Sequence, residues 1–588
     1  MPSLPPFLRP SVTEGRAAVR ARWALASTCS RGPTATALFA SILAVLLIAL
    51  AVPVEGAPGV ETGPRLAWVR QFGTSGIDWA ERVTADATGV YVAGWSAPSY
   101  DGPYTGYVRK YTHDGVELWA RNVTATGNVS VRDVTVDATG AYIAGWTDGD
   151  LQGQGSSGTR YAFIRKYSTD GDELWTRQFG APRSAGDGAW ALTARAGAIY
   201  VAGATWGTFA GQTSAGSADA FVRKYTADGD EVWTRQFGMS GNDAARAIVA
   251  DATGIYVAGS VETGGMMLAF VQKYTQDGEK GWWDQFGFNL ANIAWGVATD
   301  SSGVYVAGSA EVMVSEGGAG FLRKYTFDGK EIWSREDWDL DWLRGVATGP
   351  TGVFTSGTWR GQGDFVQEYD ADGTIVWTLF VDTPGDLFYW GDVDVHPTGI
   401  YLTGIRWGAF PGQSSAGGVD AYLAKIVVPG GSVVPGSVDL GEVEIGRSAT
   451  ANMTIASTGT APLTVTNVTL AGGIAGFSLP SPPALPLVVP SGSSVNVTVA
   501  FSPSSAGLAE DILRITTDDP AANLTEVALR GTGVPSATSR SLGGLLVWAG
   551  IVAGSVAAVA VVAYAVRRRR GTRRDAGGDD EAFHERTS

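Results

Sequence analysis

The segment Asp251-Ala-Thr-Gly-Ile-Tyr-Val-Ala-Gly-Ser260 is followed by Ala269-Phe-Val-Gln-Lys-Tyr-Thr275 and then by Trp282-Trp-Asp-Gln-Phe-Gly287. With Ala245–Ala250 before them, these pieces predict four short strands, because β-branched and aromatic runs are separated by Gly and Asp turn residues. Similar text recurs seven times in the 588-residue chain, at intervals of 44–58 residues. The strand cores begin at Val90, Ala141, Ile199, Ile255, Val304, Val353 and Ile400, and the closing tryptophans are Trp68, Trp119, Trp175, Trp233, Trp282, Trp333 and Trp377.

A repeat of this length with about four strands per unit is typical of a β-propeller. The first tryptophan strand, Leu66–Gly73, precedes every strand core. The last core ends at Asp420–Lys425, and no tryptophan strand follows it. We therefore expect residues 66–73 to pair with the last unit, because this closes the ring and removes its exposed edges.

Connection lengths differ between the two ends of the repeat. The step from the third-strand tyrosine to the tryptophan is always eight residues, whereas the preceding connection ranges from 8 residues (Gly357 to Phe365) to 18 (Gly203 to Phe221). Variation on one face of a repeat protein indicates a binding face. Aromatic rings beside amides in these loops suit a sugar or peptide ligand, although they could instead seal neighbouring blades. The candidate ligand-binding residues are Trp95, Tyr104, Trp206, Phe209, Gln212, Trp407, Phe410 and Gln413.

The phrases Trp-x-x-Gln-Phe-Gly, Asp-Ala-Thr-Gly-x-Tyr-Val-Ala-Gly and Asp-Ala-Phe-Val-Arg-Lys-Tyr resemble the SBBP repeat of secreted and surface proteins. The resemblance covers residues 64–428 and implies a seven-bladed β-propeller. The sixth unit departs from the pattern, with Glu368 in place of lysine and Thr355-Ser-Gly357 in place of Val-Ala-Gly. The seventh has His396-Pro397 in place of Asp-Ala.

A second module is expected at residues 434–534, after the linker Pro-Gly-Gly-Ser at 429–432. Alternating polar and apolar residues in Asn496–Ser502 and Ile512–Thr516 predict a β-sandwich of about seven strands. Gly441-Glu-Val-Glu-Ile-Gly446 and Val499-Ala-Phe-Ser-Pro503 resemble the Hydin-like immunoglobulin fold, often called a choice-of-anchor domain. Cys29 is the only cysteine, so no disulfide joins the sheets. We expect this module to act as a stalk.

Both ends of the chain carry apolar segments. Residues 1–57 read as a signal peptide or signal anchor with a long basic leading region. Residues 535–544 are a linker, and 545–566 predict a transmembrane helix followed by a basic and then acidic cytoplasmic tail, 567–588. The pattern predicts a single-pass type I membrane protein with an extracellular ectodomain, from an archaeal or bacterial envelope. Six sequons, which are glycosylation candidates, lie in that ectodomain: Asn122, Asn128, Asn452, Asn467, Asn496 and Asn523.

Several function classes are disfavoured. The net charge of −15 argues against nucleic acid as a partner. The three histidines are scattered, so no metal site is predicted, and no hydrolase elbow or nucleotide loop is present. The acidic turns Asp170–Glu173 and Asp228–Glu231 are too short for calcium loops. We attribute the repeated tryptophans to blade packing rather than to docking of a quinone cofactor, and we predict no cofactor.

The sequence therefore predicts an all-β protein: a seven-bladed β-propeller, an immunoglobulin-like β-sandwich, an N-terminal signal segment and one C-terminal transmembrane helix. Its expected role is a membrane-anchored surface binding or adhesion protein for a glycan or protein ligand, not an enzyme. One alternative is an extracellular hydrolase that uses acids in the propeller funnel, such as Asp78, Asp187 and Asp243. Another is a structural envelope component.

Overall fold

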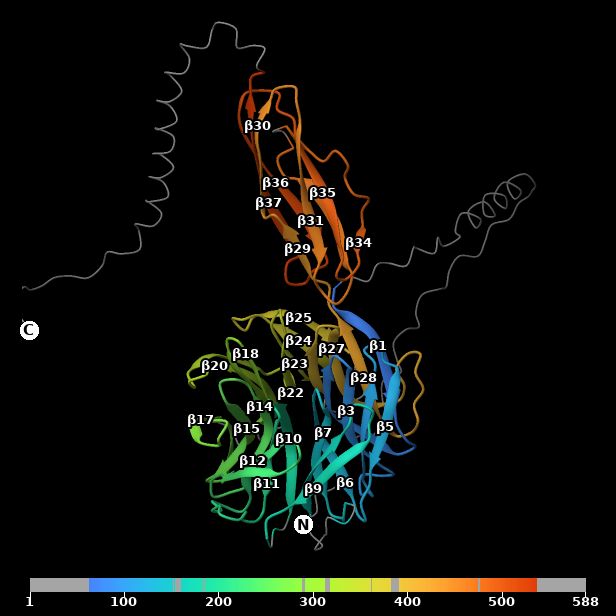
Figure 1. Cartoon of the computed structure of the whole chain (residues 1–588), viewed down its shortest axis with the longest axis vertical. Coiled ribbons are helices and arrows are strands. Elements are labelled where there is room, and N and C mark those ends of the chain that lie inside the picture. The colour runs from blue at the N-terminus through green and yellow to red at the C-terminus, as the bar shows by residue number, and fades with distance from the viewer. Residues whose placement is uncertain are drawn as a thin grey trace, which may run out of the picture. The chain divides into compact units, whose positions relative to one another are not determined.

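The computed structural model describes residues 63–536 except 152, 154–159, 183, 185, 288–290, 312–317, 361, 382–390 and 474–475, and this part is built from β-strands (Figure 1). The expected signal segment and transmembrane helix lie outside the described residues. Within those residues, no helix has the length and apolar character needed to cross a membrane.

Strands β1–β28 pair into four-stranded antiparallel sheets, the units of a β-propeller. The first three sheets contain β2 (Ile77–Asp86), β3 (Gly89–Ala97), β4 (Thr105–Tyr111) and β5 (Glu117–Val123); β6 (Val129–Asp137), β7 (Gly140–Thr147), β8 (Tyr161–Tyr167) and β9 (Glu173–Phe179); and β10 (Asp187–Arg195), β11 (Ala198–Thr205), β12 (Asp219–Thr226) and β13 (Glu231–Phe237). The next three contain β14 (Ala244–Ala250), β15 (Ile255–Thr263), β16 (Met266–Tyr274) and β17 (Lys280–Phe286); β18 (Ala291–Asp300), β19 (Gly303–Glu311), β20 (Gly318–Tyr325) and β21 (Glu331–Asp337); and β22 (Leu340–Thr348), β23 (Val353–Trp359), β24 (Gly363–Tyr369) and β25 (Ile375–Phe380).

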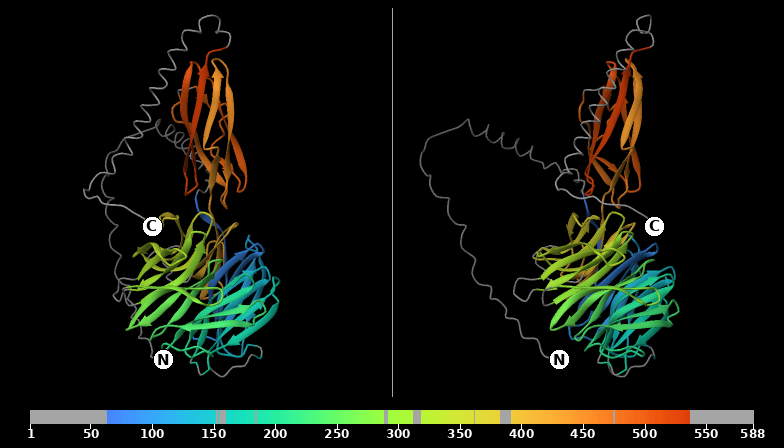
Figure 2. Two further views of the ribbon diagram at one scale, coloured as in Figure 1. Left: turned by 60° about the vertical axis from the view of Figure 1, so that its left-hand side comes forward. Right: turned by 90° about the vertical axis from the view of Figure 1, so that its left-hand side faces the viewer.

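The final sheet joins the two ends of the propeller chain. It contains β26 (Asp392–His396), β27 (Gly399–Trp407) and β28 (Val419–Val427), and its outer strand is β1 (Arg65–Phe72). β1 pairs antiparallel with β28, with Trp68 opposite Lys425. The first strands β2, β6, β10, β14, β18, β22 and β26 contact one another in this order, and β26 contacts β2 again. The predicted closure by residues 66–73 is confirmed, and Figure 2 shows the sheets following one another around the propeller.

The repeated tryptophan and lysine join most of the sheets to the next one. In the first sheet, the indole Nε1–H of Trp119 and the ammonium of Lys110 both donate to the carbonyl of Thr169, at 3.1 and 3.2 Å. Thr169 lies in the turn between the third and fourth strands of the second sheet. We call this double donation to one turn carbonyl the turn clamp. Five more turn carbonyls accept the equivalent pair: His113, Ala227, Gln276, Phe327 and Ala371.

The turn clamp places a glycine against an indole ring. Gly171 has φ +84°, and a Cβ at this position would lie 2.8 Å from the ring of Trp119. The guanidinium Nε–H of Arg121 donates to the Gly171 carbonyl at 2.7 Å. The Asp-Gly phrase of the repeat is therefore required for two reasons, the left-handed backbone and the close approach of the neighbouring sheet.

The clamp is missing between the sixth and final sheets, and this accounts for the departure at Glu368. The outer strand of the final sheet is β1, so β28 is not followed by a turn that could offer a carbonyl. Glu368 stands where the other sheets have lysine, and the indole of Trp377 donates to its carboxylate instead. A lysine here would bury a cation without its usual acceptor, which is costly.

Three aspartates join neighbouring sheets along the central channel. Apart from one parallel bridge each at the beginning of β2 and β18, the first strands are paired on one side among the described strands, so the N–H groups on the other side need acceptors. The carboxylate of Asp133 accepts from Leu192 N at 2.7 Å, in the next sheet. Asp392 and Asp394 accept from Val83 N at 3.1 Å and Ala85 N at 2.7 Å across the closing interface. Burial raises the pKa of Asp133 and of Asp394 to about 7, against the opposing effects of Arg82 and of the Ala85 N–H respectively.

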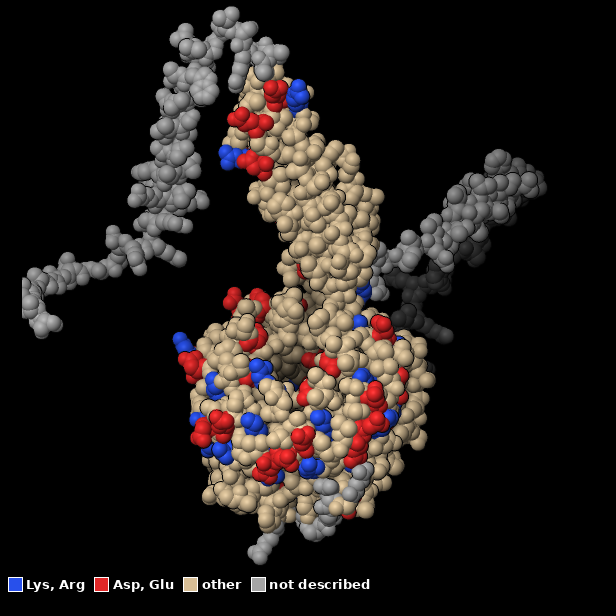
Figure 3. Space-filling model, viewed as in Figure 1, with Lys and Arg blue, Asp and Glu red and all other residues tan. Residues whose placement is uncertain are grey.

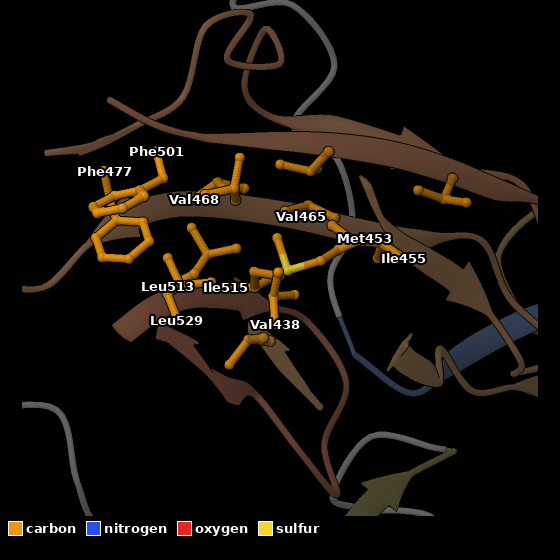
Figure 4. Close-up of a cluster of buried hydrophobic side chains, with 14 of the residues drawn as sticks. Val438, Met453, Ile455, Val465, Val468, Phe477, Phe501, Leu513, Ile515 and Leu529 are labelled. Carbon is orange, nitrogen blue, oxygen red and sulfur yellow. The ribbon is translucent and has the colours of Figure 1, made fainter. Parts of the chain in front are cut away.

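The C-terminal module is a two-sheet sandwich. One sheet has the order β29 (Gly431–Val434), β31 (Ala449–Ser457), β35 (Ser494–Phe501), β33 (Phe477–Ser478). The other has the order β30 (Ser437–Glu444), β37 (Leu524–Val534), β36 (Gly507–Thr517), β32 (Leu463–Leu470), β34 (Leu487–Val489). Their facing side chains, including Met453 and the Phe477–Phe501 pair at 4.7 Å, form one core (Figure 4). The sandwich prediction is confirmed, with short strands such as β33 and β34 beyond the expected number.

Substitutions of Trp119 should distinguish the contribution of the indole hydrogen bond from that of the packing of the indole ring. Trp119→Phe keeps a ring but removes one hydrogen bond, and should lower the free energy of unfolding by about 1 kcal/mol. Trp119→Ala also removes the packing and should cost about 3 kcal/mol. Urea unfolding measures both, with Trp206→Ala as the exposed control. Equal stability of the Trp119→Phe and wild-type proteins would contradict a role for the indole donor.

The channel aspartates should make stability pH-dependent. A carboxyl whose pKa is raised on folding stabilises the fold below its unfolded pKa, near 4, and that stability is lost as the pH rises through about 7. The melting temperature of the Asp133→Asn/Asp394→Asn variant should therefore fall less than that of the wild type between these pH values. Asp372→Asn, in an exposed turn, is the control. Parallel pH profiles for the double variant and wild type would refute the shifts.

Candidate functional site

The sheets present their variable loops at one end of the propeller. Each sheet is an antiparallel meander, so the connection between its second and third strands lies at the same end as the connection to the next sheet. The candidate residues from the sequence lie at this end, which we call the variable-loop face.

Two of the candidate loops, at 206–212 and 407–413, are held by the same arrangement of glutamine hydrogen bonds. The amide of Gln236, in β13, accepts from Phe209 N at 2.9 Å and donates to the carbonyl of Gly207 at 2.9 Å. Gln212 closes the loop, since its side-chain oxygen accepts from Gln236 N at 3.0 Å. In the final sheet, Gln71 makes the equivalent contacts with Phe410, Gly408 and Gln413.

These contacts decide what the two loops can offer a ligand. Phe209 and Phe410 are 4% and 5% exposed, and each packs edge-on against an aromatic ring of the third strand. Gln212 and Gln413 already use their side-chain oxygens within the fold. The structure therefore makes these four candidates packing and loop-closing residues, as in the sealing alternative. Trp206 remains available, with 38% of its surface exposed.

The other candidates form an aromatic cluster in the first and final sheets. Trp95 is buried, stacks on Trp79 at 5.3 Å, and donates from its indole to Glu81 at 2.9 Å. Tyr104 packs edge-on against Trp95 at 5.0 Å, and Trp407 packs partly buried against the same cluster. The cluster is anchored to the channel through Glu81.

A ring of side chains that the sequence did not reveal lines this end of the channel. In most of the first strands, the residue that pairs with a glycine of the second strand is followed by a β-bulge. A bulge turns the side chain of its extra residue in a new direction. We call the six bulge residues the bulge ring; each is partly exposed. They are Glu81, Arg132, Trp190, Arg246, Trp295 and Arg344.

Members of the bulge ring contact one another across sheets. Arg132 donates to Glu81 at 2.5 Å and lies over Trp190 at 5.5 Å. The guanidinium groups of Arg246 and Arg344 lie over Trp295, at 4.6 and 4.3 Å from the ring centroid. The ring thus alternates cations with indole faces.

The charges of the ring converge on the channel axis. Burial, and to a smaller extent the charge of Arg132, lower the pKa of Arg246 to about 10. Burial also lowers the pKa of Arg344 well below its usual value, and its charge interacts with Glu81, Arg82 and Arg246 from other sheets. The charged side chains of the bulge ring are therefore coupled electrostatically across the sheets.

Arg82 separates the bulge ring from an acidic half of the channel. Its guanidinium donates to Asp392 at 2.9 Å and reaches the Trp295 carbonyl at 3.4 Å in a non-neighbouring sheet. Beyond it lies a cavity of about 260 Å³ that Asp133, Asp392 and Asp394 line. Figure 3 shows the propeller hollowed near its middle, with charged side chains around the hollow. The three acids already accept backbone N–H groups, which makes them structural.

The acids named for a hydrolase lie where the sheet-to-sheet connections enter the first strands: Asp78 and Asp187 at the beginning of β2 and β10, and Asp243 directly before β14. Asp78, Asp187 and Asp243 are buried and accept from loop donors close in sequence: Thr74 N at 2.6 Å, Ala181 N at 3.1 Å and Met239 N at 2.6 Å. Burial raises the pKa of Asp243 to about 6. Their contacts shape the loops, in agreement with the structural reading of the recurring acids.

Two of the three histidines meet at the closing interface. His113 and His396 stack at 4.6 Å, and burial lowers the pKa of both. The described residues hold no group of three or more potential metal ligands. Thr398 bridges the pair, with its hydroxyl 2.9–3.0 Å from each Nδ1. The pair is a packing feature that replaces the usual aspartate turn.

The sequons differ in access. Asn122, Asn452, Asn467, Asn496 and Asn523 are exposed. Asn128 uses its whole amide in a loop, since its oxygen accepts from Tyr104 N at 2.8 Å and its nitrogen donates to Asp148 at 2.8 Å. A sugar on Asn128 would break these contacts, whereas the other five are sterically open candidates.

Several known proteins resemble parts of this chain. The regulatory protein FlaEY of Caulobacter vibrioides is 30% identical over 176 residues, which are 27% of this chain and 18% of that protein. The chain thus matches less than a fifth of that relative. The β-propeller domain of the Trilobed protease from Pyrococcus furiosus covers 59% of this chain and 93% of that one, with 9% identity and a TM-score of 0.33. The acylaminoacyl peptidase of Pyrococcus horikoshii covers 63% and 60%, with 9% identity and a TM-score of 0.34.

The C-terminal module has a family match. A PapD-like ASH domain of human CEP192 covers 18% of this chain and 86% of that one, with 12% identity and a TM-score of 0.15. Residues 424–523 match the family described as "Abnormal spindle-like microcephaly-assoc'd, ASPM-SPD-2-Hydin". The sandwich that follows the propeller is therefore a Hydin-like, immunoglobulin-like ASH domain.

Proposed function

We propose that this chain is a membrane-anchored cell-surface binding or adhesion protein. In this proposal its sheets form one closed seven-bladed propeller of the SBBP type, whose variable-loop face binds a glycan or protein. The ASH domain serves as the stalk, and the segments 1–57 and 545–566 direct export and hold the chain in the membrane. The exposed sequons would then carry glycans on the outer side.

The distribution of exposed aromatic rings carries this proposal. Among the described propeller residues, the strongly exposed aromatic side chains are Tyr100, Trp206, Trp338 and Phe380. All four lie in connections or at a strand end on the variable-loop face. At the opposite end of the sheets the large exposed residues are aliphatic, such as Leu174 and Ile332 on outer strands. Exposed aromatic rings are the groups that dominate binding interfaces and stack on sugars.

The hydrolase alternative has less support. Its candidate acids shape loops, and the acids along the channel accept backbone N–H groups of neighbouring sheets. A hydrolytic site needs a pair of carboxyl groups or a nucleophile with a base facing one space. The described channel instead offers arginines and indoles on the side of the variable loops.

Trp206 provides the direct test. On a glycan and protein array, Trp206→Ala in the full-length chain should weaken the best signal about tenfold, because an exposed indole at a binding face is a typical hot spot. Leu174→Ala, which removes an exposed side chain at the other end of a sheet, should leave binding unchanged. Ligand binding that survives Trp206→Ala and is lost in Leu174→Ala would place the site elsewhere. Release of sugar or peptide products by the wild-type chain would favour the hydrolase.

A further inference from the structure

Both histidines of the propeller lie at its closing interface. His113 is in the turn between β4 and β5 of the first sheet, and His396 ends β26 of the final sheet. Their rings stack with centroids 4.6 Å apart and planes 11° from parallel. The carbonyl of His113 is also the acceptor of a turn clamp, which Trp68 and Lys425 of the final sheet donate to. The pair therefore lies where the first and final sheets are held together.

His396 replaces an aspartate that caps the equivalent turn in other sheets. In the fourth sheet the carboxylate of Asp251 accepts from Thr253 N at 2.7 Å, and the same bond recurs in the first, second and fifth sheets. In the final sheet, Thr398 N donates to Nδ1 of His396 at 3.3 Å. This nitrogen can accept only while it carries no proton, so the bond requires a neutral imidazole. Protonation removes the acceptor at a pH where an aspartate would still be ionised.

The charges around the pair favour neutral rings. The titratable and charged groups that face it are Asp86, Asp114, Lys425, Arg70 and Tyr401. Burial is the main cause that lowers the pKa of both imidazoles, and the charge of Lys425 acts in the same direction. Asp86 opposes this shift at both rings and Asp114 at one of them, but they do not reverse it. Two imidazolium rings in this stack would also repel each other.

These shifts determine how acid acts on the interface. A histidine whose pKa falls on folding binds its proton more tightly in the unfolded chain, so it stabilises the fold above its unfolded pKa of about 6.5. That stability is lost as the pH falls from this value through the folded pKa. The channel aspartates act in the opposite sense, because their raised pKa values favour the fold at acidic pH. A test must therefore compare two interfaces that both contain such aspartates.

We propose that the histidine pair is an acid-sensitive latch of the propeller. The neutral rings hold the first sheet against the final sheet, and their protonation below about pH 6.5 loosens this interface. The latch acts on the closure of the propeller and goes beyond the proposed binding function, since it needs no ligand.

Hydrogen exchange of the full-length chain, read by mass spectrometry with residue-level fragmentation, tests the latch. Val83 and Ala85 donate their N–H groups to carboxylates across the closing interface, so these groups exchange when it opens. Leu192 donates to Asp133 between the second and third sheets, whose sequences contain no histidine. After correction for intrinsic exchange rates, the protection of Val83 and Ala85 should fall about tenfold relative to Leu192 between pH 7 and pH 5.

His396→Asp is the matched variant, because it restores the residue of the repeat. Its carboxylate can accept the Thr398 N–H as Asp251 does in its own turn, and it would pair with a protonated His113. The acid-induced loss of protection should therefore disappear or reverse. His113→Gln, which introduces the residue found at Gln276 in the equivalent turn, removes the repulsion but keeps the titratable acceptor. It should show an intermediate loss.

Several outcomes would overturn the latch. One is wild-type protection that does not change between pH 7 and pH 5, and another is an equal loss at Val83 and Leu192. A third is the same loss in His396→Asp as in the wild type. A melting temperature within about 2 °C of the wild type at pH 7 would show that this variant is folded. If it is not, His113→Gln decides, since a loss as large as in the wild type would exclude a role for the stacked pair.

Discussion

The propeller depends on a turn carbonyl that, at six of its interfaces, accepts two donors from the preceding sheet. At Thr169 these donors are an indole N–H and a lysine ammonium, and the same arrangement holds five more interfaces. The lysine is buried, so it requires the carbonyl, and the turn requires glycine to admit the indole. The tryptophan, the lysine and the Asp-Gly turn of the repeated phrase are each explained by a contact between neighbouring sheets. The repeated tryptophans are structural for this reason.

The location of this interaction leaves the other end of each sheet free to vary. Loops there are held by contacts that are less uniform between sheets, such as the Gln236 hydrogen bonds that recur at Gln71. Loop length can therefore change without loss of the turn clamps. Exposed aromatic rings and the bulge ring lie at this same end. A binding protein needs rigid interfaces between its sheets at one end and side chains that can vary at the other.

The sequence predicted the fold well and the site poorly, for a physical reason. Strand positions follow from alternation and turn residues, so the fourth unit matched β14–β17, and counting strands predicted the closure by β1. Phe209 and Trp206 have the same kind of sequence signal, and only the packing of the loop decides which ring is buried. The bulge ring was missed because a one-residue register shift turns Arg246 toward the channel, and alternation cannot show such a shift. The acceptor role of Glu368 likewise follows from the missing turn after β28, which the repeat pattern alone cannot explain.

Closure by β1 also governs the order in which the propeller is completed. Gln71 holds a loop 339–342 residues away along the chain, so the first strand of the propeller to be synthesised waits for the last one. Until β28 emerges, β1 stays unpaired, and unpaired edges invite association with other chains. Because the entropic cost of closure grows only slowly with loop length, the finished ring is readily stabilised once both strands are present. During synthesis, β1 is therefore open to association with other chains until β28 has been made. A propeller whose closing strands were adjacent in the sequence would avoid this interval.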